Sequence, residues 1–121
     1  MKKILGILLA ICMVAALTVE VGAWDKGTVP PLKTAPGSKA VKHNDEGIAY
    51  YNQGRWDVAR KHFAEAVKAD PKSAEAHYNL ALVLDHLDDH ENAAIHFTHA
   101  FDLGKNNPEI RNSGILKEHK Q

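Results

Sequence analysis

Cysteine is almost absent from this sequence. Its one cysteine, Cys12, lies in an N-terminal apolar stretch that we expect to be removed. The remaining chain therefore has no disulfide and no thiolate for chemistry.

An excess of charge of either sign is also missing. The chain has 15 Lys and Arg residues against 15 Asp and Glu residues, and without Lys2, Lys3 and Glu20 the balance becomes 13 against 14. Nucleic-acid-binding domains present clustered positive charge, so this balance argues against a nucleic-acid partner.

The motifs of an enzyme are missing as well. The sequence shows no nucleophile with a base, no paired acids in a pocket and no glycine loop for phosphate. Gly104-Lys105 follows a predicted helix instead of a strand, Asp88-Asp89 are predicted in a turn, and Ser73 fits a helix cap. We therefore expect a protein that is not an enzyme and needs no cofactor.

The N-terminus has the layout of a secretory signal. Basic Lys2 and Lys3 precede an apolar stretch over residues 4–19, which is shorter than the about 20 apolar residues of a membrane span. Small residues at Gly22 and Ala23 predict cleavage after Ala23, so residues 1–23 form the signal peptide. An uncleaved anchor is the alternative; a lipid on Cys12 is disfavoured. Either reading predicts an exported protein, periplasmic or secreted.

An internal repeat of 34 residues follows an extended leader, residues 24–37, which contains prolines and glycine. Within each copy, Ala-x3-Phe-x2-Ala places small residues around a large one on one helical face, a pattern typical of closely packed helices. The pairs that the shift aligns are Ala40 with Ala74, His43 with His77, Ala59 with Ala93, His62 with His96, Phe63 with Phe97 and Ala66 with Ala100.

Local signals divide the domain, residues 38–121, into five predicted helices. Repeat 40–73 holds helices over residues 39–53 and 57–69, with Gly54 in the turn and Asp57 as a cap. Repeat 74–107 holds helices over 74–87 and about 90–103, with Ser73 as a cap and Gly104 as a left-handed stop. Asn107-Pro108 then begins a capping helix over 108–119.

These motifs resemble the tetratricopeptide repeat family. Copy one carries Gly47-x2-Tyr50, Gly54, Ala59-x3-Phe63, Ala66 and Asp70-Pro71; copy two carries Leu80-Ala81-x2-Leu84, Ala93-x3-Phe97 and Ala100. The resemblance implies an all-α fold, a short α-solenoid of two tetratricopeptide-type antiparallel helical hairpins plus a C-terminal capping helix. A generic array of four or five helices is the alternative. The family's tryptophan position is His43 and His77, and its leucine position in copy one is Glu46, which fits a terminal edge that faces water.

The resemblance also implies a function. Members use the first helices of their hairpins to line a concave groove that binds a protein or peptide. Carried onto this chain, the protein-binding groove consists of Asn44, Ile48, Tyr51, Asn52, Tyr78, Asn79, Leu82, Asp85 and His86. This groove contains no Lys or Arg, so we expect its ligand to be a neutral or basic segment. The expected function is that of a scaffold or adaptor in the bacterial envelope. A merely solvated helix face is the alternative.

Two further possibilities follow from the composition. The chain has eight histidines, and His62, His96 and His99 are weak candidates for a metal-binding row, which leaves an exported metal-handling protein as the alternative function. Their titration predicts a pH-sensitive fold.

Two repeats are fewer than a stable stack usually needs, so we also expect possible self-association through residues near the C-terminus.

Overall fold

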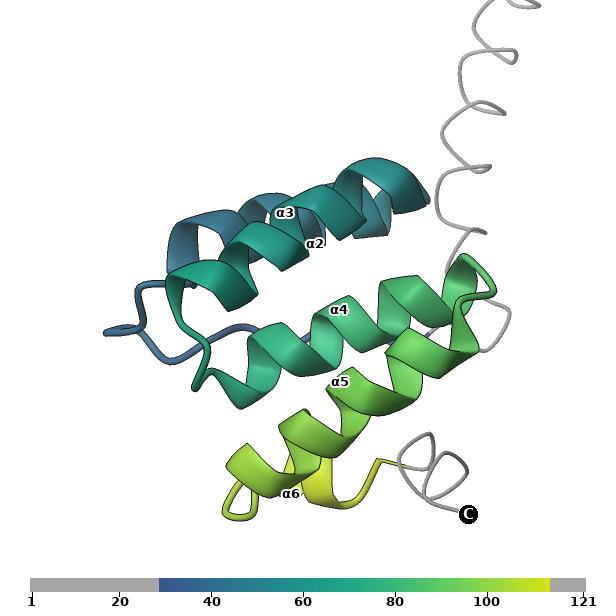
Figure 1. Cartoon of the computed structure of the whole chain (residues 1–121). Helices are drawn as coiled ribbons and strands as arrows, with labels where there is room; N and C mark the ends of the chain where they lie inside the picture. The colour runs from purple at the N-terminus through teal and green to yellow at the C-terminus, as the bar shows by residue number, and fades with distance from the viewer. Residues whose placement is uncertain (1–28, 114–121) are drawn as a thin grey trace, which may run out of the picture.

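The computed structural model describes residues 29–113 (Figure 1). The predicted signal peptide, its cleavage site, the start of the leader and residues 114–121 lie outside the described residues. Within residues 29–113 the chain forms helices and no strands. The helices are α2 (Val41–Asn52), α3 (Trp56–Ala69), α4 (Ala74–His86), α5 (His90–Leu103) and α6 (Pro108–Arg111).

Two helical hairpins stack on each other. Helix α2 packs against α3, α4 packs against α5, and α3 packs against α4, so the second helix of the first hairpin meets the first helix of the second (Figure 1). The short α6 contacts both α4 and α5. The predicted fold class is therefore confirmed.

Tight turns reverse the chain within each hairpin. Gly54 lies at φ +72°, a left-handed conformation that glycine adopts without steric cost, and its N–H donates to the carbonyl of Tyr51. Asp88 takes the corresponding conformation in the second hairpin, at φ +62°. Aspartate tolerates this region better than most residues, so the missing glycine of copy two does not prevent the turn.

Helix caps agree with the sequence in part. Ser73 caps α4 by accepting the N–H of Ala76, and Asn107 caps α6 by accepting the N–H of Glu109, as predicted. The prediction for Asp57 is wrong: Arg55 occupies the cap position without a side-chain bond, and Asp57 lies in the first turn of α3. The capping helix ends at Arg111, earlier than predicted, with Asn112 as its C-cap.

Gly104 is needed for a different reason from the one predicted. Its φ is −101°, so it is not a left-handed stop. A Cβ atom at this position would lie 2.8 Å from the carbonyl oxygen of Ala100 and 2.9 Å from Cδ1 of Ile110. Glycine therefore lets α6 approach the end of α5 closely.

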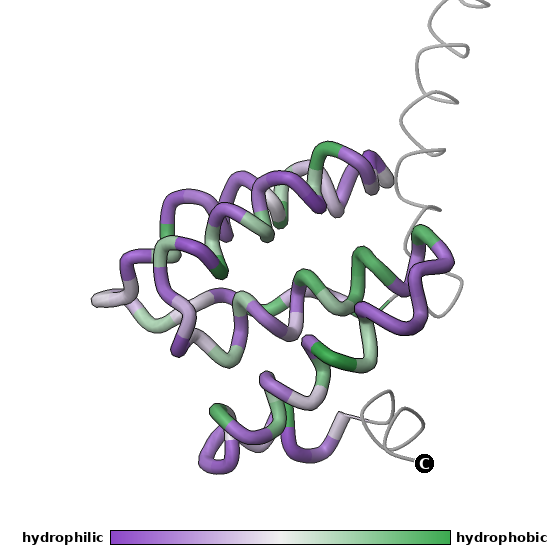
Figure 2. Tube along the Cα trace, viewed as in Figure 1, coloured by the Kyte–Doolittle hydropathy of each residue, from purple (hydrophilic) through white to green (hydrophobic). Residues whose placement is uncertain are grey.

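The core follows the repeated Ala-x3-Phe-x2-Ala pattern. Phe63 and Phe97 are buried, and the four alanines around them, Ala59, Ala66, Ala93 and Ala100, are each 0% exposed. Most of α4 is buried because it lies between α3 and α5, and apolar residues gather along it (Figure 2). No helix within residues 29–113 is both long enough and apolar enough to cross a membrane.

Candidate functional site

The predicted groove is lined by the first helices of the two hairpins, and the leader of the chain lies in it. Residues 29–35 form no helix and pass behind α4 in the view of Figure 1. Val29 and Leu32 are partly buried against the core, as is Ile48 of α2. The leader therefore lies along the surface that the sequence predicts as the ligand groove.

Two buried amides hold the main chain of Leu32. Asn79 of α4 accepts the Leu32 N–H through its Oδ1 at 2.7 Å and donates from Nδ2 to the Leu32 carbonyl at 2.7 Å. Asn44 of α2 donates to the same carbonyl at 2.9 Å, and Asn79 also donates to Oδ1 of Asn44 at 2.8 Å. Both asparagines are 0% exposed. Because both main-chain groups of Leu32 are paired, the contact recognises an extended backbone irrespective of the side chain.

A tyrosine extends this recognition toward the start of the leader. The hydroxyl of Tyr51 donates to the carbonyl of Val29 at 2.8 Å and lies 3.2 Å from Nε2 of His86. Because that hydroxyl has one proton, His86 is the donor of the second bond. Burial raises the pKa of Tyr51, and the nearby Tyr78 and Asp85 raise it further, so the hydroxyl stays protonated.

His86 is fixed between aromatic groups. Its ring stacks on Trp56 with centroids 4.0 Å apart and planes 3° from parallel. Burial lowers the pKa of His86, and the charge of Asp85 opposes that shift. The neutral ring can therefore donate from Nε2 to Tyr51. Trp56 was not among the predicted groove residues, because it belongs to a second helix of a hairpin.

The remaining predicted groove residues lie elsewhere or face other groups. Leu82 is buried in the core, and Asn52 is exposed at the end of α2. The hydroxyl of Tyr78 lies 3.1 Å from Oγ of Ser113, close enough for a hydrogen bond. Asp85 pairs with Nδ1 of His90 at 2.7 Å. The structure thus brings Asn44, Tyr51 and Asn79 to the leader and places Ile48 against the core, and whether they bind a partner stays a prediction.

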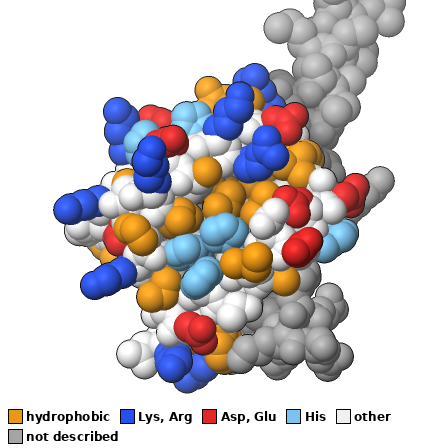
Figure 3. Space-filling view, viewed as in Figure 1, with side chains coloured by type: hydrophobic (Ala, Val, Ile, Leu, Met, Phe, Trp, Pro, Cys, Tyr) orange, Lys and Arg blue, Asp and Glu red, His pale blue; other side chains and the backbone are white. Residues whose placement is uncertain are grey.

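Five of the histidines within residues 29–113 form two groups instead of one row. His62 lies beside Glu46 and His43, whereas His96 lies beside His77 and His99. Figure 3 shows histidine side chains gathered near the middle of one face of the domain. The proposed row of His62, His96 and His99 is not a group whose ligand atoms converge among the described residues.

His77, at the family's tryptophan position, is buried and has a partner for each ring nitrogen. Its Nε2 donates to the carbonyl of Pro71 at 2.8 Å, which leaves Nδ1 to accept from His96 at 3.0 Å. Burial lowers the pKa of His77, the bond to Pro71 partly opposes this, and His99 lowers it further. His43 differs: its Nδ1 is buried and has no hydrogen-bond partner among residues 29–113.

Comparison with known proteins gives one informative result. A family model described as Tetratricopeptide repeat matches residues 44–108, which is more than half of the chain. The match begins at Asn44, inside α2, and covers the rest of both helical hairpins. A comparison with curated proteins gives no match.

Proposed function

The chain belongs to the tetratricopeptide repeat family, and from that premise we propose that its groove binds an extended segment of a partner protein. Repeats of this family are typically non-catalytic interaction modules. The finer proposal concerns the surface formed by Asn44, Ile48, Tyr51 and Asn79, which we call the leader groove. Its ligand is a main chain in extended conformation.

The contact between the two asparagines and Leu32 is the observation that carries this proposal. An amide pair that bonds both the N–H and the carbonyl of one residue provides affinity without selecting a side chain, as added strands do in other recognition modes. Selection then comes from the apolar surface under Val29 and Leu32. Residues 29–37 include Lys33 and no acid, in keeping with a preference for neutral or basic segments.

The leader is then a competitor held on the same chain. A tethered segment has a high effective concentration at its site, so a free peptide must displace it. We propose that a partner binds with full affinity when the leader has left the groove. This gives the leader groove a closed and an open state.

The test opens the leader with one substitution. Leu32→Asp places a charge against the apolar core and favours release of the leader, whereas Ala35→Asp adds the same charge at an exposed position. A fluorescent peptide of residues 27–36 should bind Leu32→Asp at least about tenfold more tightly than it binds Ala35→Asp. Fluorescence anisotropy measures both affinities, and circular dichroism checks that both proteins are folded.

Two further arms make this test decisive. Adding Asn79→Ala to Leu32→Asp should weaken binding of the peptide strongly, because the N–H at position 32 of the ligand loses its acceptor and the carbonyl loses one of its two donors. A peptide with glutamate in place of Lys33 should bind more weakly than the natural one. The proposal fails if a folded Leu32→Asp protein does not bind the peptide, or binds it equally well without Asn79.

We also propose that residues 1–23 direct export and are removed after Ala23. The support is the basic start, the apolar stretch of residues 4–19 and the small residues before the cut. Intact-mass measurement of the protein recovered from the periplasm or medium of an expressing bacterium should give a chain that begins at Trp24. Recovery of the uncleaved chain in the membrane fraction would instead support the anchor.

A further inference from the structure

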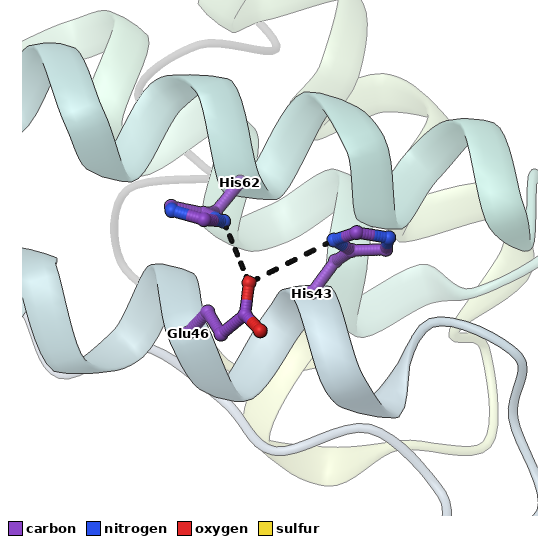
Figure 4. Close-up of side chains that lie close together, drawn as sticks. All are labelled: His43, Glu46 and His62. Carbon is purple, nitrogen blue, oxygen red and sulfur yellow. Dashed lines mark ion pairs between the residues drawn. The ribbon is translucent and has the colours of Figure 1, made fainter.

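A second group of side chains lies between the helices of the first hairpin. His43 and Glu46 lie one turn apart on α2, and His62 reaches them from α3 (Figure 4). Oε2 of Glu46 is 2.9 Å from Nδ1 of His62 and 3.9 Å from Nδ1 of His43. We propose that His43, Glu46 and His62 bind a divalent transition metal, with Zn²⁺ as the probe.

The spacing suits a metal ion. Atoms bound tetrahedrally to zinc at about 2.0–2.1 Å lie about 3.3 Å from one another. The distances of 2.9 Å and 3.9 Å fall on either side of that value, and one ligand atom from each residue lies within 4.8 Å of the others. Small side-chain rotations therefore bring the three onto one ion. Two imidazoles and one carboxylate are ligands that zinc accepts.

His43 supplies the observation that an ion pair does not explain. A salt bridge between Glu46 and protonated His62 would satisfy those two groups. It would leave Nδ1 of His43 as it is, buried and without a hydrogen-bond partner within residues 29–113. Buried polar atoms normally have a partner. A cation between Nδ1 of His43 and the carboxylate of Glu46 would be the partner that Nδ1 lacks.

The neighbours of His62 hold its ring in place. Tyr50 stacks on it with centroids 5.2 Å apart and planes 5° from parallel. The guanidinium of Arg55 lies 5.1 Å from the centre of the same tyrosine ring. An oriented ring loses little freedom when it binds a metal. The side chains of the three ligands are 28–39% exposed, which leaves a fourth position for water.

The second repeat offers a natural comparison. Shifting by 34 residues turns His43 and His62 into His77 and His96, so each hairpin holds a histidine pair across its two helices. In the second pair the two Nδ1 atoms share a hydrogen bond of 3.0 Å, and Leu80 stands where the first repeat has Glu46. Within residues 29–113, the group of His43, Glu46 and His62 is the one whose three ligand atoms converge.

The experiment is a calorimetric titration of Zn²⁺ into the tag-free chain without its predicted signal peptide. We expect one equivalent to bind and the melting temperature to rise with free Zn²⁺, because the ion binds the folded state. Glu46→Gln and His62→Gln should each weaken binding by more than the roughly 10–100-fold that loss of an outer-shell partner costs.

His96→Gln is the matched control, since it removes the equivalent histidine of the second repeat. It should keep the stoichiometry and affinity of the wild type. The proposal is overturned if no Zn²⁺ binds, if Glu46→Gln and His62→Gln bind as the wild type does, or if His96→Gln is the variant that loses binding. Circular dichroism of each variant separates loss of a ligand from loss of the fold.

Discussion

At the scale of single residues, Asn79 connects the leader to the repeats. It bonds both main-chain groups of Leu32 and the side chain of Asn44, and none of its surface is exposed. Asn79→Ala removes the partner of the Leu32 N–H and of Oδ1 of Asn44, and each unsatisfied buried group costs about 1–3 kcal/mol. We expect the free energy of unfolding, measured by urea denaturation, to fall by about 2–3 kcal/mol in this variant.

The matched control is Asn52→Ala, an asparagine at the exposed end of α2. It should change the free energy of unfolding by less than about 0.5 kcal/mol, as exposed substitutions usually do. Equal losses in the two variants would mean that the bonds of Asn79 to the leader contribute nothing to the folded state.

The sequence predicted which residues belong to the groove, but not which groups their side chains contact. Asn44, Tyr51 and Asn79 are groove positions by the family's spacing, and the structure places all three on the leader. The sequence predicts Tyr78 as a groove residue as well, yet its hydroxyl lies beside Ser113. These contacts depend on where the leader and the segment after α6 run, and helical periodicity does not carry that information.

At the scale of elements, the interface of α4 and α5 should respond to pH. Burial lowers the pKa of His77 and of His96, and the neighbouring His99 adds to both shifts. A histidine whose pKa is lower in the folded state makes its full contribution to stability at pH values above 6.5, which is its pKa in the unfolded state. That contribution is lost as the pH falls below 6.5. His86 acts in the same direction.

We therefore expect the melting temperature to be level from pH 8 to about 6.5 and to fall toward pH 5. Thermal denaturation followed by circular dichroism measures this profile. His96→Gln should reduce the slope below pH 6.5. A flat profile between pH 5 and 8 would contradict the expectation.

Element boundaries were predictable where a local signal decides them. Ser73 and Asn107 act as caps because a side chain one turn from its target needs no distant partner. Gly104 was misinterpreted because its need comes from Ile110 and Ala100, and the sequence shows the glycine without showing what approaches it. Long-range packing decides such positions.

At the scale of the whole molecule, the two hairpins followed from the repeat and the position of the leader did not. Pro30, Pro31 and Pro36 predict an extended conformation, and the described leader forms no helix over residues 29–35 and a turn at residues 36–37. Its docking requires Asn44 and Asn79 to meet across two helices, positions that are 35 residues apart and so are not equivalent in the 34-residue repeat. Only the stacked hairpins bring them together.

The last prediction concerns how the leader leaves the groove. Its described part is held by hydrogen bonds to three side chains and by two partly buried apolar residues, whereas α4 is buried along most of its length. Segments with few buried contacts open without global unfolding. The amide of Leu32 should therefore exchange with solvent through a smaller opening free energy than the amide of Val83, which lies inside α4.

Native-state hydrogen exchange at increasing urea measures both openings. Exchange at Leu32 should change little at low urea, because release of the leader exposes little surface, while exchange at Val83 should follow global unfolding. If both amides have the same free energy and the same urea dependence, the leader leaves only when the domain unfolds. In that case the groove would have no open state in the folded protein, and a partner would have to bind another surface.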